Sequence, residues 1–276
     1  MPGGNGDAAT ARRLCRRLEI EDARYIEIES KRRVVPSAVD EVRKYLRRRR
    51  GVKHEKTVLF FDQFLDTRDM ILFKKGASLR LRYKGGGGKV YLQYKGPGFR
   101  SRGVLYRSEF SSERLLHLMR EESRHDIVHF SEVNVADILD KHADPAMGRA
   151  MRKHLGVSII NRLDCGNLLC AYYKEKYSVD LGAAMLEPSL DQVHAFHLGD
   201  RGPHPVSTFW EVENEIKAHS GNRIAPKLAH LDALYELDAE LGERFGLAAE
   251  PLDKYHRCSS FFVTASGARK TGTRRK

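Results

Sequence analysis

The chain has 276 residues, 41% of them hydrophobic, which is enough to bury the core of one large domain. Lys and Arg number 49 against 37 Asp and Glu, and the formal net charge of +12 predicts attraction to phosphate chains, nucleic acid or acidic lipid surfaces without choosing among them. No apolar stretch reaches the roughly 18 residues that span a bilayer. The four cysteines form neither a CxxC pair nor a regular framework, so we expect a cytoplasmic protein with reduced thiols.

The first 50 residues predict two basic helices on either side of a strand. Residues 1–21 are expected to be a basic leader with a short helix, and an organelle-targeting role for this leader is the alternative to a cytoplasmic location. The strand is expected over 24–35. Ser37 then begins a helix whose last turn carries Arg47 to Arg50, where positive charge complements the helix dipole.

A glycine run organises the next part of the chain. Strands are predicted over 79–84 and 89–95, and Gly85–Gly88 between them predicts a hairpin turn, because glycine tolerates the positive φ values of tight turns. Glycine runs also cradle phosphate in other proteins, but between two alternating strands a turn is favoured. Further strands are expected over 58–62 and 106–110.

The second half of the chain predicts helices and strands in alternation. We expect residues 112–155 to be mainly helical, with their histidines on the surface or structural rather than bound to metal. The other expected elements are strands over 157–163, 168–176, 177–181 and 211–217, a loop over 187–207, a helix over 226–246 and a disordered basic tail from residue 267. Solvated basic ends are favoured, with a nucleic-acid or polyphosphate contact as the alternative.

Three of these strands carry charge on alternate residues. The charged rows are Glu27, Glu29 and Lys31; Arg80 and Arg82; and Glu211, Glu213 and Glu215. Successive side chains of a strand point to opposite faces, so each row lies on one face. Three such rows indicate a barrel with a covered outer wall and a polar lumen that holds a ligand. Carboxylates suit a hard divalent cation, and Lys and Arg suit the phosphates that such a cation accompanies.

The ordered set of motifs resembles the CYTH family, also called triphosphate tunnel metalloenzymes. Glu27 to Lys31 (Glu-Ile-Glu-Ser-Lys) is similar to the family's opening Glu-x-Glu-x-Lys signature. Four further stretches resemble later family strands in the same order: Phe60 to Asp62, Gly76 to Arg82, Leu92 to Pro97, and Arg107 to Glu109. The resemblance continues through Arg162, Asp180, Glu211, Glu213 and Lys227, and covers about residues 22–235.

This resemblance implies an α+β fold, a closed antiparallel eight-stranded β-barrel that forms a tunnel, with helices packed on the outside. It implies that phosphate oxygens are gripped by Lys31, Arg80, Arg82 and Lys95, which are also the catalytic set, and by Arg162 and Lys227. It implies that Mg²⁺ or Mn²⁺ is held by Glu27, Glu29, Asp180, Glu211 and Glu213, with Glu109 as a further metal or phosphate partner. We accordingly expect a basic leader over 1–21, a tunnel domain over 22–235, and a C-terminal helix end with a disordered basic tail over 236–276.

Two stretches depart from the family pattern. The family has Asp-Thr-Pro after its second strand, whereas here Asp62 is followed by three other residues before Asp66 and Thr67. The late acidic row offers two Glu-x-Glu pairs, and only Glu213 belongs to both. The register is therefore open at both places.

The resemblance implies metal-dependent hydrolysis of a triphosphate, either inorganic triphosphate or a nucleoside or thiamine triphosphate. A class IV-type adenylate cyclase that makes cyclic AMP from ATP is the alternative enzyme. A binding module for polyphosphate or an RNA 5′-triphosphate, with little turnover, is the alternative outside enzymes. Charged rows that merely form salt bridges in an inert barrel are disfavoured, because burying many charges without a ligand is costly. The sequence leaves the oligomeric state open.

Overall fold

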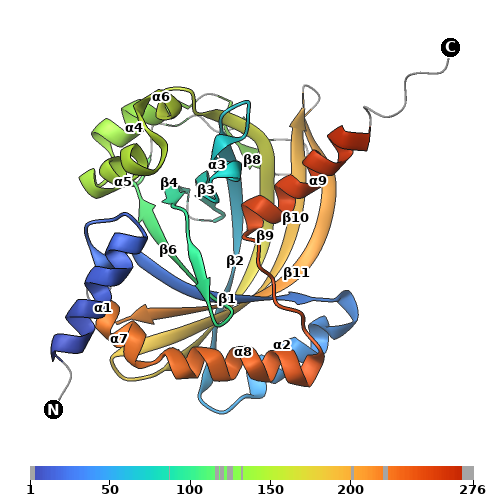
Figure 1. Ribbon diagram of the computed structural model, residues 1–276. Coiled ribbons are helices and arrows are strands. Elements are labelled where there is room, and N and C mark those ends of the chain that lie inside the picture. The colour runs from blue at the N-terminus through green and yellow to red at the C-terminus, as the bar shows by residue number, and fades with distance from the viewer. Residues whose placement is uncertain are drawn as a thin grey trace.

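Eight antiparallel strands form a closed ring in this computed structural model, which describes residues 4–86, 88–115, 118, 121–122, 127–131, 133–199, 202–219 and 223–268. The order around the ring is β1, β11, β10, β9, β2, β3, β4 and β6, and β6 pairs with β1 to close it (Figure 1). The bounds are β1 Ile26–Val34, β2 Val52–Asp66, β3 Ser78–Lys84, β4 Lys89–Lys95, β6 Val104–Ser111, β9 Asp164–Asp180, β10 Ala184–Gly199 and β11 Gly202–Ala218. The expected eight-stranded tunnel is confirmed.

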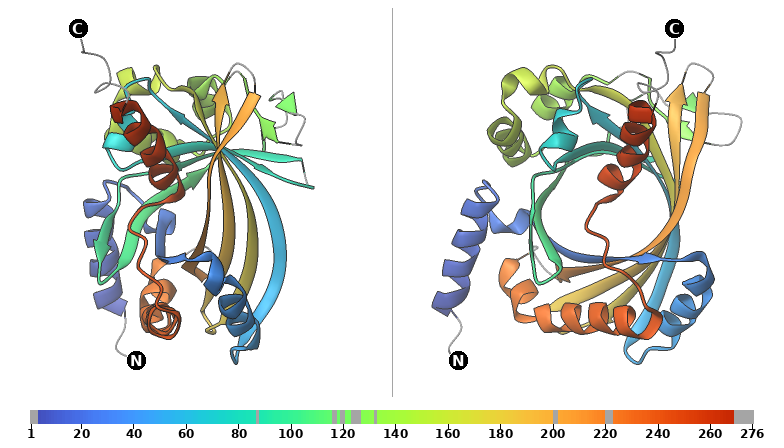
Figure 2. Two further views of the ribbon diagram at one scale, coloured as in Figure 1. Left: turned by 90° about the vertical axis from the view of Figure 1, so that its right-hand side faces the viewer. Right: turned by 45° about the vertical axis from the view of Figure 1, so that its right-hand side comes forward.

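Most helices pack on the outside of the ring, and one crosses a mouth of it. The outer helices are α1 Gly4–Arg17, α2 Val39–Arg48, α3 Ile71–Lys74, α4 Val135–Lys141, α5 Pro145–Leu155, α6 Val157–Ile160, α7 Ile224–Ala229 and α8 Leu231–Phe245. The last helix, α9 Lys254–Ala268, and the segment before it run across the opening of the ring (Figure 2). Short strand β5 Phe99–Ser101 pairs with β6, and β7 Glu121–Glu122 pairs with β8 Val128–His129. None of the described helices is both long and apolar enough to cross a bilayer.

Alternation along the strands places the hydrophobic core outside the ring and charge inside it. On β1, Ile26 and Ile28 are fully buried among apolar side chains of the covering helices, including Leu237 and Leu241 of α8. The alternate residues Glu27 and Lys31 take the opposite face and line the cavity, whereas Arg32 shares the outer face and pairs with Asp238 of α8. Because the outer face must meet helices and the inner face must hold charge, a register slip of one residue would bury both sets wrongly.

Two of the expected elements are wrong. The stretch 187–207, expected to be a loop from its prolines and glycines, belongs to the long hairpin of β10 and β11. Pro188 is tolerated because the pairing of β10 with β9 is interrupted beside it, and Pro203 and Pro205 lie outside the part of β11 that pairs with β1. The stretch 157–163, expected to be a strand, begins with α6 instead.

Other elements differ in extent. The expected strand 58–62 is the centre of the longer β2, and the expected strands 168–176 and 177–181 are one strand, β9. Within 112–155 the helices begin at Val135, and the described residues before them include the β7–β8 pair. The hairpin of β3 and β4 around the glycine run is confirmed. The basic residues from 269 onward lie outside the described part of the chain.

A buried ion pair ties β2 to β3 inside the ring. Asp62 is fully buried and lies opposite Arg82 in the strand register. Its oxygens lie 2.8 Å from Nε of Arg82 and 3.0 Å from Nη1 of Arg80, and the Tyr172 hydroxyl donates to it at 2.9 Å. Burial alone would raise the pKa of Asp62, but the two guanidinium groups outweigh burial and hold the pKa well below its ordinary value.

We predict that Asp62→Asn destabilises the protein at pH 7 by about 3 to 5 kcal/mol, because it leaves buried guanidinium groups without a counter-charge. A carboxyl with a lowered native pKa contributes stability above its unfolded pKa of about 3.9 and loses it as the pH falls. The difference in free energy of unfolding between wild type and Asp62→Asn should therefore become smaller from pH 7 to pH 3. Urea denaturation at several pH values measures it. Asp232→Asn, on the exposed side of α8, is the control, and a gap that stays constant with pH would contradict the ion pair.

A second prediction concerns the N-terminal segment. Leu18, just after α1, is buried in the main core, whereas Arg13 in the same helix is exposed. Leu18→Ala should lower the free energy of unfolding by about 2 to 5 kcal/mol, and Arg13→Ala by no more than about 0.5 kcal/mol. Both are measured by urea denaturation. If Leu18→Ala lowered the free energy of unfolding as little as Arg13→Ala, residues 1–21 would be a leader that does not contribute to the stability of the fold.

Candidate active site

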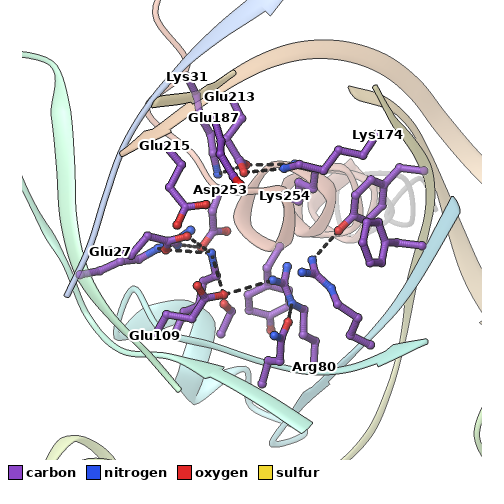
Figure 3. Close-up of a pocket in the computed structure, with 18 of the residues that line it drawn as sticks. Glu27, Lys31, Arg80, Glu109, Lys174, Glu187, Glu213, Glu215, Asp253 and Lys254 are labelled. Atoms are coloured by element: carbon purple, nitrogen blue, oxygen red, sulfur yellow. Dashed lines mark hydrogen bonds and ion pairs between the residues drawn. The ribbon is translucent and has the colours of Figure 1, made fainter. Parts of the chain in front are cut away.

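The ring encloses a cavity of about 190 Å³ whose walls are densely charged (Figure 3). Its basic lining residues are Lys31, Arg80, Arg82, Lys95, Arg107, Lys174, Lys176, Lys217 and Lys254. Its acidic lining residues are Glu27, Glu109, Glu187, Glu213, Glu215 and Asp253. Among the described residues, nine positive groups therefore face six negative ones. The excess favours an anion, and the acidic groups give a cation places to accompany it.

Strand register sets opposite charges beside one another in this cavity. Glu27 of β1 lies opposite Arg107 of β6, and Lys31 lies opposite Glu213 of β11. The Arg107 guanidinium lies 2.8 Å from Glu27, and Lys31 Nζ lies 3.2 Å from Glu213. Because the strands are antiparallel neighbours around a closed ring, the period-2 pattern alone brings these charges into one space.

Glu27, Glu109 and Glu215 form an acidic group on one wall, here called the open acidic group. Each contributes a carboxylate oxygen, and these oxygens lie within 4.8 Å of one another. Lys95 Nζ is 2.7 Å from Glu27 and 3.3 Å from Glu109. Burial, reinforced by the charges of the other two carboxylates and only partly offset by Lys217, raises the pKa of Glu215 to about 7. Three carboxylates in reach of one another, one of them poorly compensated, are a donor set that fits a hard divalent cation.

Asp191, Glu211 and Glu213 form a second acidic group, here called the inner acidic group. Their carboxylate oxygens also lie within 4.8 Å of one another, and all three residues are buried. Asp191 and Glu211 have no exposed surface, and Glu213 alone of the three lines the cavity. Lys254, the first residue of α9, enters this group through the mouth of the ring.

Several basic side chains are held on the cavity wall. Lys217 Nζ lies 2.8 Å from Glu187 and 3.0 Å from Glu215, and these carboxylates hold the pKa of Lys217 above its ordinary value although burial opposes them. Lys176 lies 3.6 Å from Glu187, and burial lowers its pKa. A weakly paired, partly desolvated ammonium gains most from a bound anion.

The structure brings many of the sequence-predicted site residues together. Glu27, Lys31, Arg80, Arg82, Lys95, Glu109 and Glu213 all line the cavity. Glu29 and Glu211 are fully buried behind its surface, where Glu29 pairs with Lys31 and Arg107, and Glu211 pairs with Lys254.

Three predicted site residues lie elsewhere. Asp180 ends β9 at the turn into β10, with its side chain 80% exposed and close to His219. Arg162 precedes β9 and pairs with Asp69 on the surface at 2.8 Å. Lys227 is buried on α7, where Nζ donates to the Ile26 carbonyl oxygen at 2.7 Å rather than lining the cavity. None of the three is among the cavity-lining residues, because Arg162 and Asp180 lie beside the two ends of β9 and Lys227 lies on α7, outside the ring.

Sequence reasoning missed about half of the charged residues that line the cavity. Lys174 and Lys176 alternate with Tyr173 and Glu175 on β9, so the period-2 pattern could have revealed them. Glu187 was missed because residues 187–207 were expected to be a loop. The strands of Arg107, Glu215 and Lys217 were predicted, but these residues were not assigned to the site. Asp253, Lys254 and Tyr255 lie beyond the expected domain limit of 235, and no local pattern shows that this segment returns to the cavity.

Two solved structures are similar to this one, and the first supports the fold. HpAC1 from Hippeastrum, a candidate adenylyl cyclase described as having a dominant triphosphatase activity, matches with a TM-score of 0.52 and 19% sequence identity, over 85% of this chain and 95% of that one. A candidate adenylate cyclase from Bacillus halodurans matches with a TM-score of 0.47 and 17% identity, over 84% of this chain and 96% of that one. A search of curated proteins finds no match.

The sequence itself matches a protein family. The model of the CYTH domain covers residues 25–164, which run from just before β1 to the first residue of β9 and amount to half of the sequence. The match includes the charged strands β1, β3, β4 and β6 that form one side of the cavity. The chain belongs to the CYTH domain family.

Proposed function

We propose that this protein is a divalent-metal-dependent triphosphatase, which hydrolyses a phosphoanhydride bond of inorganic triphosphate or of a nucleoside or thiamine triphosphate. The observation that carries the proposal is the enclosed cavity in which nine basic groups surround the open acidic group. Membership of the CYTH family supports it, as does the triphosphatase activity described for HpAC1. Mg²⁺ and Mn²⁺ are the candidate metals, because the donors are carboxylate oxygens.

Basic side chains on opposite walls would bind the phosphate chain. Arg80 and Arg82 present planar guanidinium groups, which Asp62 orients from behind, and Lys176 and Lys217 face them from other strands. Guanidinium and ammonium groups form charge-assisted hydrogen bonds to phosphate oxygens. Fixed donors of this kind position the phosphorus atom under attack and neutralise charge without rearranging during the reaction.

The open acidic group would hold the metal. When bound there, a divalent cation supplies positive charge to the phosphate oxygens and orients the attacking water. In hydrolysis the water oxygen bonds to phosphorus, the bridging oxygen leaves with the rest of the chain, and a proton is released. Glu27, Glu109 and Glu215 would bind from three strands, β1, β6 and β11, so the ring itself fixes their separation.

A class IV-type adenylate cyclase is the second candidate. The rings of Phe60 and Tyr172 line the cavity beside Arg82, with centroids 5.4 Å apart, and aromatic faces of this kind can stack on a nucleobase. The same grip on ATP would then serve attack by the ribose 3′-hydroxyl. The third candidate, a module that binds polyphosphate or an RNA 5′-triphosphate with little turnover, would use the same basic walls. One panel separates all three: phosphate, pyrophosphate and cyclic AMP released from inorganic triphosphate, ATP and thiamine triphosphate.

We predict that Glu215→Gln lowers metal affinity and turnover together, each by at least about 10-fold, because the amide keeps the size of the side chain but removes a negative ligand. Phosphate release is measured across Mg²⁺ and Mn²⁺ titrations. Glu236→Gln, on the exposed side of α8, is the matched control and should behave as wild type. A variant of Glu215 with unchanged metal dependence would remove this residue from the metal site.

A further prediction isolates phosphate binding. Lys176→Met removes a cavity ammonium whose recorded carboxylate contact, to Glu187, is as long as 3.6 Å, so the acidic groups keep their closer partners. The lost charge-assisted bond is worth about 1.5 to 3 kcal/mol, so the Kd for inorganic triphosphate should rise by about 10-fold or more. Isothermal calorimetry measures the Kd. Lys89→Met, at the exposed start of β4, is the control, and equal affinity in both variants would argue against triphosphate in this cavity.

A further inference from the structure

We propose that Lys254 is a built-in cation of the site, which occupies the inner acidic group and thereby restricts divalent metal to the open acidic group. The part that concerns the open acidic group rests on the proposed function. The place of Lys254 in the inner acidic group does not.

The ammonium group of Lys254 lies among all three carboxylates. Nζ is 2.8 Å from Asp191, 2.6 Å from Glu211 and 3.2 Å from Glu213. The Lys254 side chain is only 6% exposed. Figure 3 shows it reaching inward beside Glu213 and Lys174. One cation surrounded by carboxylate oxygens from two neighbouring strands, β10 and β11, is the arrangement that a metal ion would otherwise adopt.

Lys254 donates a hydrogen bond to Glu213 at 3.2 Å, and it acts on Asp191 and Glu211 as a point charge. No oxygen of Asp191 or Glu211 receives a hydrogen bond of good geometry within the described part of the protein. Their other cations are farther away, with Lys174 Nζ 3.6 Å from Asp191 and Arg257 Nη1 3.6 Å from Glu211. Lys254 is therefore the close counter-charge for two fully buried carboxylates, and removing it would leave each of them with only the more distant cation.

Electrostatics favour a charged Lys254. Burial by itself would lower the pKa of this ammonium, but the three carboxylates outweigh burial and hold the pKa well above its ordinary value. The open acidic group also has an ammonium beside it, because Lys95 lies 2.7 Å from Glu27 and 3.3 Å from Glu109. It differs because Glu215 pairs with Lys217 instead, at 3.0 Å, so no one recorded cation contact spans all three carboxylates, and because the three residues face the cavity and Glu109 retains 29% exposure. A metal ion that arrives with a phosphate chain can reach the open group, whereas the inner group is filled and mostly sealed.

Contacts on both sides fix the backbone that carries Lys254. Asp253 accepts from Nη1 of Arg107 at 2.7 Å, and the Tyr255 ring stacks on Phe64 with centroids 4.9 Å apart. One turn later, Cys258 Sγ lies 3.3 Å from Sγ of Cys170 on β9. They join the start of α9, which crosses a mouth of the ring (Figure 2), to β6, β2 and β9. The C-terminal helix is thus anchored in the position that delivers the ammonium.

The test is to count bound Mn²⁺ by EPR titration in wild type, Lys254→Met and Lys254→Arg, with thermal melts of each with and without Mn²⁺. Wild type and Lys254→Arg should bind one Mn²⁺ per chain. Lys254→Met should bind two, and Mn²⁺ should raise its Tm more than that of wild type, because the second ion stabilises only the folded variant. Two ions in wild type, or a folded Lys254→Met that gains none, would overturn the inference.

Two further outcomes keep the result decisive. If Lys254→Met folds only in the presence of Mn²⁺, the ion has replaced the ammonium and the inference holds. If Lys254→Met folds neither with nor without Mn²⁺, the double variant Lys254→Met with Glu211→Gln is tested, because it removes one charge of each sign. This double variant should fold and bind one Mn²⁺ per chain. Two bound ions in the double variant would overturn the inference. A wild type that binds no Mn²⁺ would contradict the proposed metal-dependent function, whereas the gain of an ion in Lys254→Met would still support the role of Lys254.

Discussion

Charge buried inside a closed ring must be compensated within that ring or by a ligand, and the rest of this structure follows from that constraint. Isolated ions cannot be moved from water into such a space without a cost of several kcal/mol each. The strands answer with cross-strand pairs such as Glu27 with Arg107 and Lys31 with Glu213. After this pairing, the cavity still has an excess of positive groups and one acidic group that is open to it. The excess positive charge suits a phosphate chain, and the open acidic group suits the metal ion bound to that chain.

The same constraint gives the C-terminal helix its place. A ring of this kind has two mouths, and α9 crosses one of them while its first residue compensates the inner acidic group. The apolar and aromatic packing of Tyr255 and Cys258 closes that end. α9 is therefore part of the cavity wall rather than an appendage, although Lys254 lies 41 positions after Glu213 in the sequence.

The parts of the fold that the sequence predicts are those governed by local periodicity. Alternation in β1, β3 and β11 predicts a charged lumen, and the glycine run predicts the hairpin of β3 and β4. The prediction of a loop over 187–207 was wrong. Prolines usually end strands, whereas here they lie within the β10–β11 pairing, and the pairing with the strand on the other side is interrupted or absent beside them. Local periodicity fails for Asp180, Arg162 and Lys254, which lie at or beside the ends of helices or strands. Whether a residue near an element end faces the cavity depends on tertiary packing that a local pattern does not contain.

The proposed function requires that a triphosphate and one divalent cation bind inside the ring, with the cation on the open acidic group. The most direct measurement is an anomalous difference map from crystals grown with Mn²⁺ and a slowly hydrolysed triphosphate analogue. We expect one Mn²⁺ peak among Glu27, Glu109 and Glu215, with the phosphate chain against Arg80, Arg82 and Lys176. An analogue bound outside the ring, or a manganese peak absent from these three carboxylates, would contradict it.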